Sequence, residues 1–256
     1  MILEIDAGNT RAKWRLLLSQ GHVTPALSAG AIFMKGDPQD DALSLTRSIA
    51  GLCTGRIDTI RVSNVRGDAF QRQLRDAVMN EWGLVPEFPT PVKECAGVVN
   101  GYDEPEKLGV DRWLAILAAY SAAGAQCCVV DCGTTITVDL VSDVGIHLGG
   151  YIVPGLIMMK TMLTRQSSVL KWEAQPVNDI VPGHNTADAI NHGALAMIAG
   201  FIDRVLSEAA ADAKSPVLYL TGGDGLLVQQ FLDHRSLYKP ELVLDGLHLA
   251  CAKHRR

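Results

Sequence analysis

The chain opens with MILEIDAGNTRAKW, residues 1–14, and the fold can be inferred from this segment. An apolar run is broken at Asp6, passes at once into Gly8, Asn9 and Thr10, and is followed by a second apolar-rich run. This order predicts two strands, Met1–Ile5 and Ala12–Ser19, paired as a hairpin around the turn.

The residue types in this turn suit the phosphates of a nucleotide. Glycine admits a close approach of the backbone to a ligand, and the amides of such a turn can cradle phosphate oxygens. Asn9 and Thr10 add side-chain donors, and Lys13 adds a positive charge. Asp6 would repel phosphate directly, but it can hold a hydrated Mg²⁺. The alternative is an ordinary hairpin turn, in which Asp and Asn are common.

The same pattern recurs at Asp131-Cys-Gly-Thr-Thr135, after the apolar run Gln126–Val130. A third run, Val217–Leu220, ends in a Gly-Gly turn of the kind that suits close contact with an adenosine. Two such strand–turn–strand units, nearly half the chain apart, predict a duplicated α/β fold with a cleft between its halves. Asp131 and Thr134 would then form the second half of a nucleotide clamp.

Composition narrows the class of protein. The 256 residues carry a net charge of −5, whereas nucleic-acid-binding proteins are typically basic, so we expect no nucleic-acid partner. The six cysteines form no CxxC pair, and this favours reduced thiols in a cytoplasmic protein over a zinc site. We find no signal peptide and no uninterrupted apolar stretch of about 18 residues, so we expect no membrane partner.

The remaining elements are read from apolar spacing and turn residues. The segment Val85–Lys107 contains four prolines and predicts a long loop, which in a compact protein is often functional. An extended segment is expected at Gly21–Phe33. Helices are expected at 40–53, 68–82, from Gly109, at 155–164, after a cap at Asn185 or Thr186, and at 242–252.

Beyond these patterns, the chain resembles the actin–hexokinase–Hsp70 superfamily of phosphotransferases, and within it the type III pantothenate kinases. The stretches that carry the resemblance are DAGNTRAKW (6–14), YDEP (102–105), LGVDRW (108–113), DCGTTITVD (131–139), GGYIVPG (149–155) and NTADAINHG (185–193). It implies duplicated actin-like (ribonuclease H-like) domains, with mixed sheets flanked by helices and an interdomain cleft. We place the two halves at residues 1–108 and 109–256.

The resemblance also implies a role for each matching position. Asp111 would be the general base, and Asp131 would hold a monovalent cation, K⁺ or NH₄⁺. Mg²⁺ would bind with ATP, contacting Asp6 through water. ATP would be bound by Asp6, Ala7, Gly8, Asn9, Thr10, Arg11, Ala12, Lys13 and Thr134. Pantothenate would be bound by Tyr102, Gly109, Val110, Asp111, Arg112 and Thr186.

The chemistry of these residues agrees with such roles. Asp111 falls in the first turn of its predicted helix, where the helix dipole favours the ionised form that a base requires. Arg112 offers a rigid fork of donors to an anion, and the helix start at Thr186 offers backbone amides. The alternatives are a first-turn acid with no other task and a solvated surface arginine. Asp139 follows the second turn along its strand, where facing the cleft and ending the strand are both open, and it is not assigned to the site.

The activity implied is ATP-dependent phosphorylation of the primary hydroxyl of pantothenate, the first step of coenzyme A biosynthesis, by a homodimer. Two other hypotheses are a catalytically weak actin-like regulatory protein that binds nucleotide and a protein partner, and a sugar or acetate kinase of the same superfamily. The combination of Asp6, Asp111 and Asp131 argues against a regulator. The short length and LGVDRW argue against another kinase.

Overall fold

The computed structural model describes residues 1–18, 26–166, 179–210 and 215–251. Contacts divide the chain into two compact units. The first unit comprises Met1–Ala118 and Leu242–Arg256, and the second comprises Ala119–Glu241.

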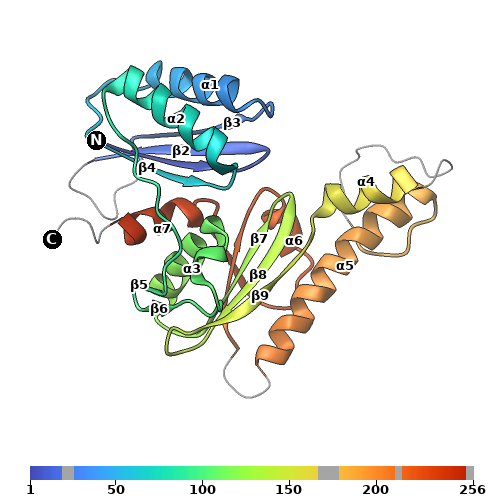
Figure 1. Cartoon of the computed structure of the whole chain (residues 1–256). Helices are drawn as coiled ribbons and strands as arrows, with labels where there is room; N and C mark the ends of the chain where they lie inside the picture. The colour runs from blue at the N-terminus through green and yellow to red at the C-terminus, as the bar shows by residue number, and fades with distance from the viewer. Residues whose placement is uncertain (19–25, 167–178, 211–214, 252–256) are drawn as a thin grey trace. The chain divides into compact units, whose positions relative to one another are not determined.

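The first unit is built on a four-stranded mixed sheet. Its order is β3-β2-β1-β4, with β1 antiparallel to β2 and parallel to β4. Helices α1 and α2 cover one face of this sheet, and α7 lies on the other (Figure 1). The bounds are β1 Ile2–Ala7, β2 Arg11–Leu17, β3 Ser28–Phe33, β4 Thr59–Asn64, α1 Pro38–Ala50, α2 Gly67–Trp82 and α7 Leu242–Cys251.

Successive side chains along a strand point to opposite faces of this sheet. Leu3, Ile5 and Ala7 on β1 join the apolar core beneath α1 and α2. Glu4 and Asp6, at the intervening positions, face the opposite way. Glu4 is fully buried there, and its charge is compensated because Arg15 Nε donates to it at 2.8 Å and Arg61 Nη1 at 3.2 Å.

The division into compact units differs from the expected division at residues 108 and 109. Helix α7 closes the chain but belongs to the first unit, where Arg15 Nη1 lies 2.6 Å from Asp245 Oδ1. At Gly246, α7 crosses α3 (Val110–Ala123) so closely that an added Cβ would overlap the backbone of Leu114. The final helix therefore returns to the sheet of the N-terminal half.

The second unit repeats the strand arrangement of the first. Its sheet has the order β11-β10-β7-β8-β9, with β7 antiparallel to β8 and parallel to β10. The order β9-β8-β7-β10 thus matches β3-β2-β1-β4, and the expected duplicated fold is confirmed. The bounds are β7 Cys127–Cys132, β8 Thr135–Val141, β9 His147–Pro154, β10 Val217–Thr221, β11 Ser236–Tyr238, α4 Leu156–Gln166, α5 Thr186–Ala209 and α6 Gly225–Gln229.

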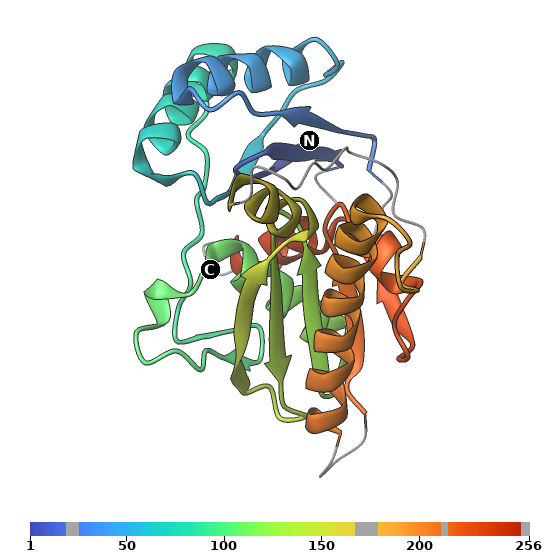
Figure 2. The same cartoon turned by 90° about the vertical axis from the view of Figure 1, so that its right-hand side faces the viewer.

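Helix α5 runs along the second sheet (Figure 2). Its Leu195, Ile198 and Ile202 pack in one core with Val130 and Ile136 of β7 and β8. Among the described helices, α5 is the one that length and composition would allow to cross a membrane, with a mean hydropathy of 1.2 over 18 residues. Half of that 18-residue window is buried inside the protein, and a helix in a protein core meets the same criteria.

Several local features differ from the sequence-based expectations. The expected loop Val85–Lys107 contains a short hairpin, β5 (Glu94–Cys95) with β6 (Val98–Val99), and a 3₁₀ turn, η1 (Pro105–Lys107). Strand β11 had not been expected. Of the expected extended segment Gly21–Phe33, residues 21–25 lie outside the described residues, and β3 begins at Ser28.

Candidate active site

The turn between β1 and β2 forms the first part of the site. Asp6 and Lys13 are direct partners across the antiparallel ladder, so their side chains lie on the same face at the mouth of the hairpin. Gly8 N–H closes the turn onto Arg11 O at 3.2 Å, and a Cβ at Gly8 would approach that oxygen to 2.9 Å. Asn9 and Thr10 are exposed, so a ligand can reach their donors.

Not every residue of the expected ATP set offers a side chain to a ligand. Ala7 and Ala12 are fully buried in the core of the first unit, so only their backbone is available. The guanidinium of Arg11 lies over the ring of Phe33, with Cζ 4.6 Å from the ring centroid. The side-chain donors of this hairpin therefore come from Asn9 and Thr10 in the turn, from Lys13, and from Arg11, which keeps its N–H groups while it lies over Phe33.

Arg66, which the sequence analysis did not single out, contacts this turn from the start of α2. Its Nη1 donates to Asn9 O at 3.1 Å and to Gly8 O at 3.5 Å. Its Nη2 forms an ion pair with Asp41 of α1 at 2.5 Å. No sequence motif links Arg66 to the turn, because 57 residues separate it from Asn9.

Asp41 is held in its ionised form. Its burial opposes ionisation, but the backbone N–H groups of Lys35 and Gly36 donate to its oxygens at 2.7 and 2.9 Å. Together with the Arg66 guanidinium, these donors hold the pKa of Asp41 below its usual value. The Asp41–Arg66 pair is therefore charged at neutral pH.

Asp111 lies at the first turn of α3 and is partly buried. Its Oδ1 accepts the N–H of Arg112 at 2.8 Å, which fixes the carboxylate at the helix start. A Cβ at Gly109 would lie 2.7 Å from the same oxygen, so glycine is required beside it. Val110, the first residue of α3, is also partly buried.

Arg112 is not the solvated surface residue of the alternative interpretation, because only 7% of it is exposed. Its Nη1 donates to the hydroxyl oxygen of Tyr102 at 2.8 Å. Asn100, which is fully buried and which the sequence analysis missed, positions this partner. Asn100 Oδ1 accepts the Tyr102 N–H at 3.0 Å, while its Nδ2 donates to Pro105 O at 3.1 Å.

The turn between β7 and β8 in the second unit has a different support. Backbone lies directly against it: Gly155 N–H donates to Thr134 O at 3.1 Å, and a Cβ at Gly155 would overlap the carbonyls of Gly133 and Thr134. A Cβ at Gly222, whose φ is +86°, would overlap Asp131 and the backbone of Cys132. Asp131 is partly buried, and Thr134 is exposed.

Two further charged residues, Lys160 of α4 and Asp224, interact in the second unit. Burial lowers the pKa of Lys160, and the nearby Asp224 opposes this shift. Burial likewise raises the pKa of Asp224 against the effect of Lys160. Asp224 N–H also donates to Cys132 O at 3.0 Å, which ties this residue to the Asp131 turn.

At the start of α5 the expected anion site is partly occupied by the protein itself. Asn185 is the N-cap, and its Oδ1 accepts the N–H of Asp188 at 2.9 Å. The acidic side chain of Asp188 lies in the same first turn, with Oδ2 2.7 Å from Asn185 Nδ2. Thr186 is exposed, so its hydroxyl is available, but one of the expected free amides is not.

The predicted residues are thus divided between the two units. Asp6 to Lys13, Tyr102 and Gly109 to Arg112 belong to the first unit, whereas Asp131, Thr134 and Thr186 belong to the second. Asp139, which the sequence analysis did not assign to the site, is buried with Oδ1 2.9 Å from His147 Nε2. In the described part of the chain, no group of three or more His, Cys, Asp or Glu residues is arranged to hold a metal ion.

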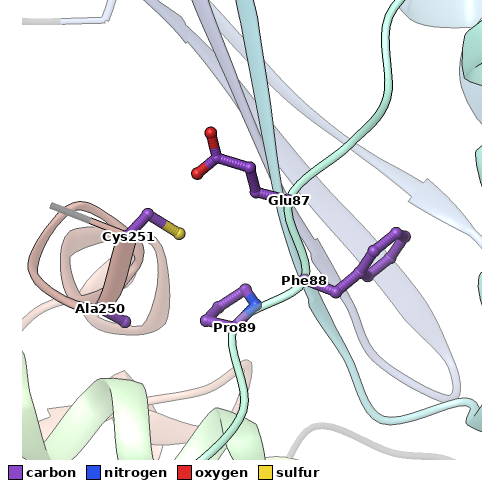
Figure 3. Close-up of a pocket in the computed structure, with 5 residues that line it drawn as sticks. All are labelled: Glu87, Phe88, Pro89, Ala250 and Cys251. Atoms are coloured by element: carbon purple, nitrogen blue, oxygen red, sulfur yellow. The ribbon is translucent and has the colours of Figure 1, made fainter. Parts of the chain in front are cut away.

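A separate pocket of about 180 Å³ opens in the first unit between Glu87, Phe88 and Pro89 on one side and Ala250 and Cys251 of α7 on the other (Figure 3). None of the predicted site residues lines it. Burial is the main reason that the pKa of Cys251 is raised to about 12, so its thiol is protonated and unreactive at neutral pH.

Comparison with known proteins places this chain in a family. A family model described as type III pantothenate kinase matches residues 2–208. The type III pantothenate kinase of Pseudomonas putida is 35% identical over 256 residues, covering 98% of this chain and 99% of that protein. The one from Cellvibrio japonicus is 35% identical over 257 residues, covering 97% of this chain and 96% of that protein.

Among solved structures, the inorganic polyphosphate/ATP-glucomannokinase from Arthrobacter sp. strain KM matches with a TM-score of 0.52 and covers 99% of both chains. At 12% identity this likeness concerns the fold alone, and it agrees with the duplicated actin-like architecture. The near-complete match to curated relatives and to the family model settles the narrower assignment: the chain belongs to the type III pantothenate kinase family.

Proposed function

We propose that this protein transfers the γ-phosphoryl group of ATP to the primary hydroxyl of pantothenate, the first step of coenzyme A biosynthesis. The observation that carries the proposal is the cluster at the start of α3, in a chain that matches the family over nearly its whole length. Arg112 is held by Tyr102 there, next to the fixed carboxylate of Asp111.

The reaction uses these residues in separate roles. Amides of the first turn and the ammonium of Lys13 bind the ATP phosphates, and Arg112 binds the carboxylate of pantothenate. Asp111 accepts the hydroxyl proton while the alcohol oxygen bonds to Pγ, the bond from Pγ to the bridging oxygen breaks, and ADP leaves. Positioning and charge neutralisation contribute most of the rate, because phosphoryl transfer has a loose transition state.

Two cations complete the proposed site. The partly buried carboxylate of Asp6 is an oxygen ligand of the kind that Mg²⁺ prefers, and Mg²⁺ would neutralise charge on the phosphates. Asp131 would hold K⁺ or NH₄⁺. Among the described residues, Asp131 belongs to no group of three or more His, Cys, Asp or Glu that could hold a metal ion, so its further ligands would be backbone carbonyl oxygens and water.

The proposal includes a homodimer. Apolar side chains on β9, an edge strand of the second sheet, and on α4 and α5 are exposed: Leu148 59%, Ile152 61%, Ile157 65%, Met162 54% and Met197 62%. Exposed apolar surface of this kind marks contact surfaces. Analytical ultracentrifugation should give twice the mass of the chain, and a monomer at micromolar concentration would contradict this part.

We further infer a cytoplasmic location. All six cysteines are free thiols, and five of them are buried, which suits a reducing compartment. Fractionation of cells that express the chain should recover it with cytoplasmic markers; recovery in a membrane or extracellular fraction would contradict the inference.

The decisive experiment is a coupled ADP-release assay with ATP and pantothenate. Asp111→Asn should lower kcat by about two orders of magnitude or more, the scale of a lost general base. Asp68→Asn is a matched control, because Asp68 is an exposed first-turn acid of α2. Near-normal turnover of Asp111→Asn would reject the assigned base, and ATP binding without pantothenate-dependent ADP release would favour a regulatory protein.

The same assay tests the monovalent cation. Activity should depend strongly on K⁺ or NH₄⁺, and Asp131→Ala should weaken this dependence. Equal activity when Na⁺ replaces K⁺ in the wild type would remove the cation from the proposal.

A further inference from the structure

Arg66 is fixed on three sides where it meets the turn between β1 and β2. Its side chain is 6% exposed, and its guanidinium lies over the ring of Phe70, with Cζ 4.7 Å from the centroid. One end of the guanidinium pairs with Asp41, and the other contacts the carbonyl oxygens of Gly8 and Asn9. The side chain thus connects α1, α2 and the turn.

The backbone at Arg66 is fixed as well. Arg66 N–H donates to Asn64 Oδ1 at 2.9 Å, and Asn64 Nδ2 donates to Gly67 O at 3.1 Å. Asn64 is the last residue of β4, which pairs with β1 directly beside the turn. The backbone of Arg66 is therefore fixed relative to β1, the strand that leads into Gly8.

The contacts of Arg66 determine which way the turn amides point. In a trans peptide the carbonyl and the following N–H point in opposite directions. Because the carbonyls of Gly8 and Asn9 point toward Arg66, the N–H groups of Asn9 and Thr10 point away from it. Asn9 and Thr10 are exposed, so a ligand can come within reach of amides that point away from Arg66.

We propose that Arg66 is a positioning residue, which holds the peptide groups after Gly8 and Asn9 so that their amides face the phosphates of ATP. The inference rests on the proposed function, because that function assigns the phosphates to this turn. A turn with either peptide reversed would present a carbonyl oxygen to a phosphate oxygen, and the two would repel.

A role in stability alone explains the arrangement poorly. A buried ion pair is weak evidence for stability, since desolvation offsets the attraction between its charges. Arg66 Nε is buried and has no hydrogen-bond partner among the described residues, which adds to that cost. Asp41 neutralises the guanidinium, and burial keeps it from the solvent, so Arg66 acts through the turn and does not bind the phosphate itself.

The test compares Arg66→Gln and Arg66→Lys with Arg72→Gln, a control at an exposed arginine of α2. Arg66→Gln should raise the KM for ATP roughly 10- to 100-fold, the scale of lost hydrogen bonds to a charged group. The KM for pantothenate and inhibition by adenosine should change less than about threefold. Arg66→Lys, which keeps the charge but not the fork of donors, should lie between wild type and Arg66→Gln.

Direct binding of MgATP, measured without pantothenate by calorimetry, separates this inference from the proposed function. If the wild type binds MgATP but transfers no phosphoryl group to pantothenate, the proposed function fails, and the binding data on the Arg66 variants still decide the inference. An unchanged affinity of Arg66→Gln for MgATP would overturn it. So would an equal loss of affinity for MgATP and adenosine. If Arg66→Gln fails to fold, the affinity of Arg66→Lys for MgATP decides in its place.

Discussion

The turns that follow β1 and β7 are the same motif held in two different ways. Each follows a strand that pairs antiparallel with the next strand and parallel with a later one. In the first unit, a long side chain, Arg66, contacts the turn from another element. In the second unit, the backbone at Gly155 and Gly222 lies directly against the turn.

This difference shows that topology can be duplicated while the support of a site is not. The last ladder pairs are Ala7 with Ala12 in the first hairpin and Cys132 with Ile136 in the second, so the turns also differ in length. A side-chain support depends on charge and therefore on pH. A backbone support depends on the absence of a Cβ. The two turns should consequently fail under different substitutions.

The largest effect is expected from Asp41→Asn, which leaves the buried Arg66 without its counter-charge. Removing one partner of a buried ion pair should lower the free energy of unfolding by about 3–5 kcal/mol at pH 7. Urea unfolding followed by circular dichroism measures this change. Asp40→Asn, at an exposed neighbour on α1, is the control.

The effect of Asp41→Asn should depend on pH. The folded-state pKa of Asp41 lies below its unfolded value of about 3.9, so its contribution is complete above that value and is lost as pH falls through the folded pKa. The difference between wild type and Asp41→Asn should therefore be constant from pH 6 to 8 and shrink in acid. A difference that grows in acid would contradict a charge-based support of the first turn.

An intermediate effect is expected from Gly222→Ala in the second unit. Its φ of +86° disfavours any residue with a Cβ, and that atom would overlap Asp131 and Cys132. The substitution should lower the free energy of unfolding by about 2–4 kcal/mol. Gly223→Ala is a close control, because a Cβ there meets no atom within 4 Å. Equal stability of the two variants would mean that backbone contact does not support this turn.

The smallest effect is expected from Tyr238→Phe. The Tyr238 hydroxyl donates to Gly222 O at 3.0 Å. This is one side-chain hydrogen bond beside the backbone contacts that support the second turn. Its loss should cost about 1 kcal/mol, the usual contribution of one hydrogen bond. Thermal unfolding would measure it. A loss as large as that of Gly222→Ala would show that the second turn, like the first, relies on a side chain.

The sequence predicted those parts of the molecule that depend on neighbouring residues. The hairpin after Met1, its repeat at Asp131 and the helix that places Asp111 in its first turn follow from apolar spacing and turn residues, and the structure contains all three. The short strand β11 was missed, because three residues are too few to show a periodic pattern.

Residues that support the site from elsewhere in the chain were not predicted. Arg66 acts on Asn9 across 57 positions, and Arg15 reaches Asp245 across 230, which draws α7 into the first unit. Asn100 lay inside a segment read as a loop, although it is fully buried and positions Tyr102. The residues next to Asn100 do not indicate that its side chain will form hydrogen bonds with backbone groups of a folded loop.

The two strand–turn–strand units, the residue types available for phosphate and carboxylate recognition, and the family could all be inferred from the sequence alone. Local alternation and the freedom of glycine are properties of adjacent residues, so a linear reading captures them. The folded structure was needed to show what supports each turn, namely Arg66 in the first unit and the backbone at Gly155 and Gly222 in the second. A peptide plane can lie either way round in an isolated turn, and contacts with distant elements, such as Arg66 in one unit and Gly222 in the other, select one orientation.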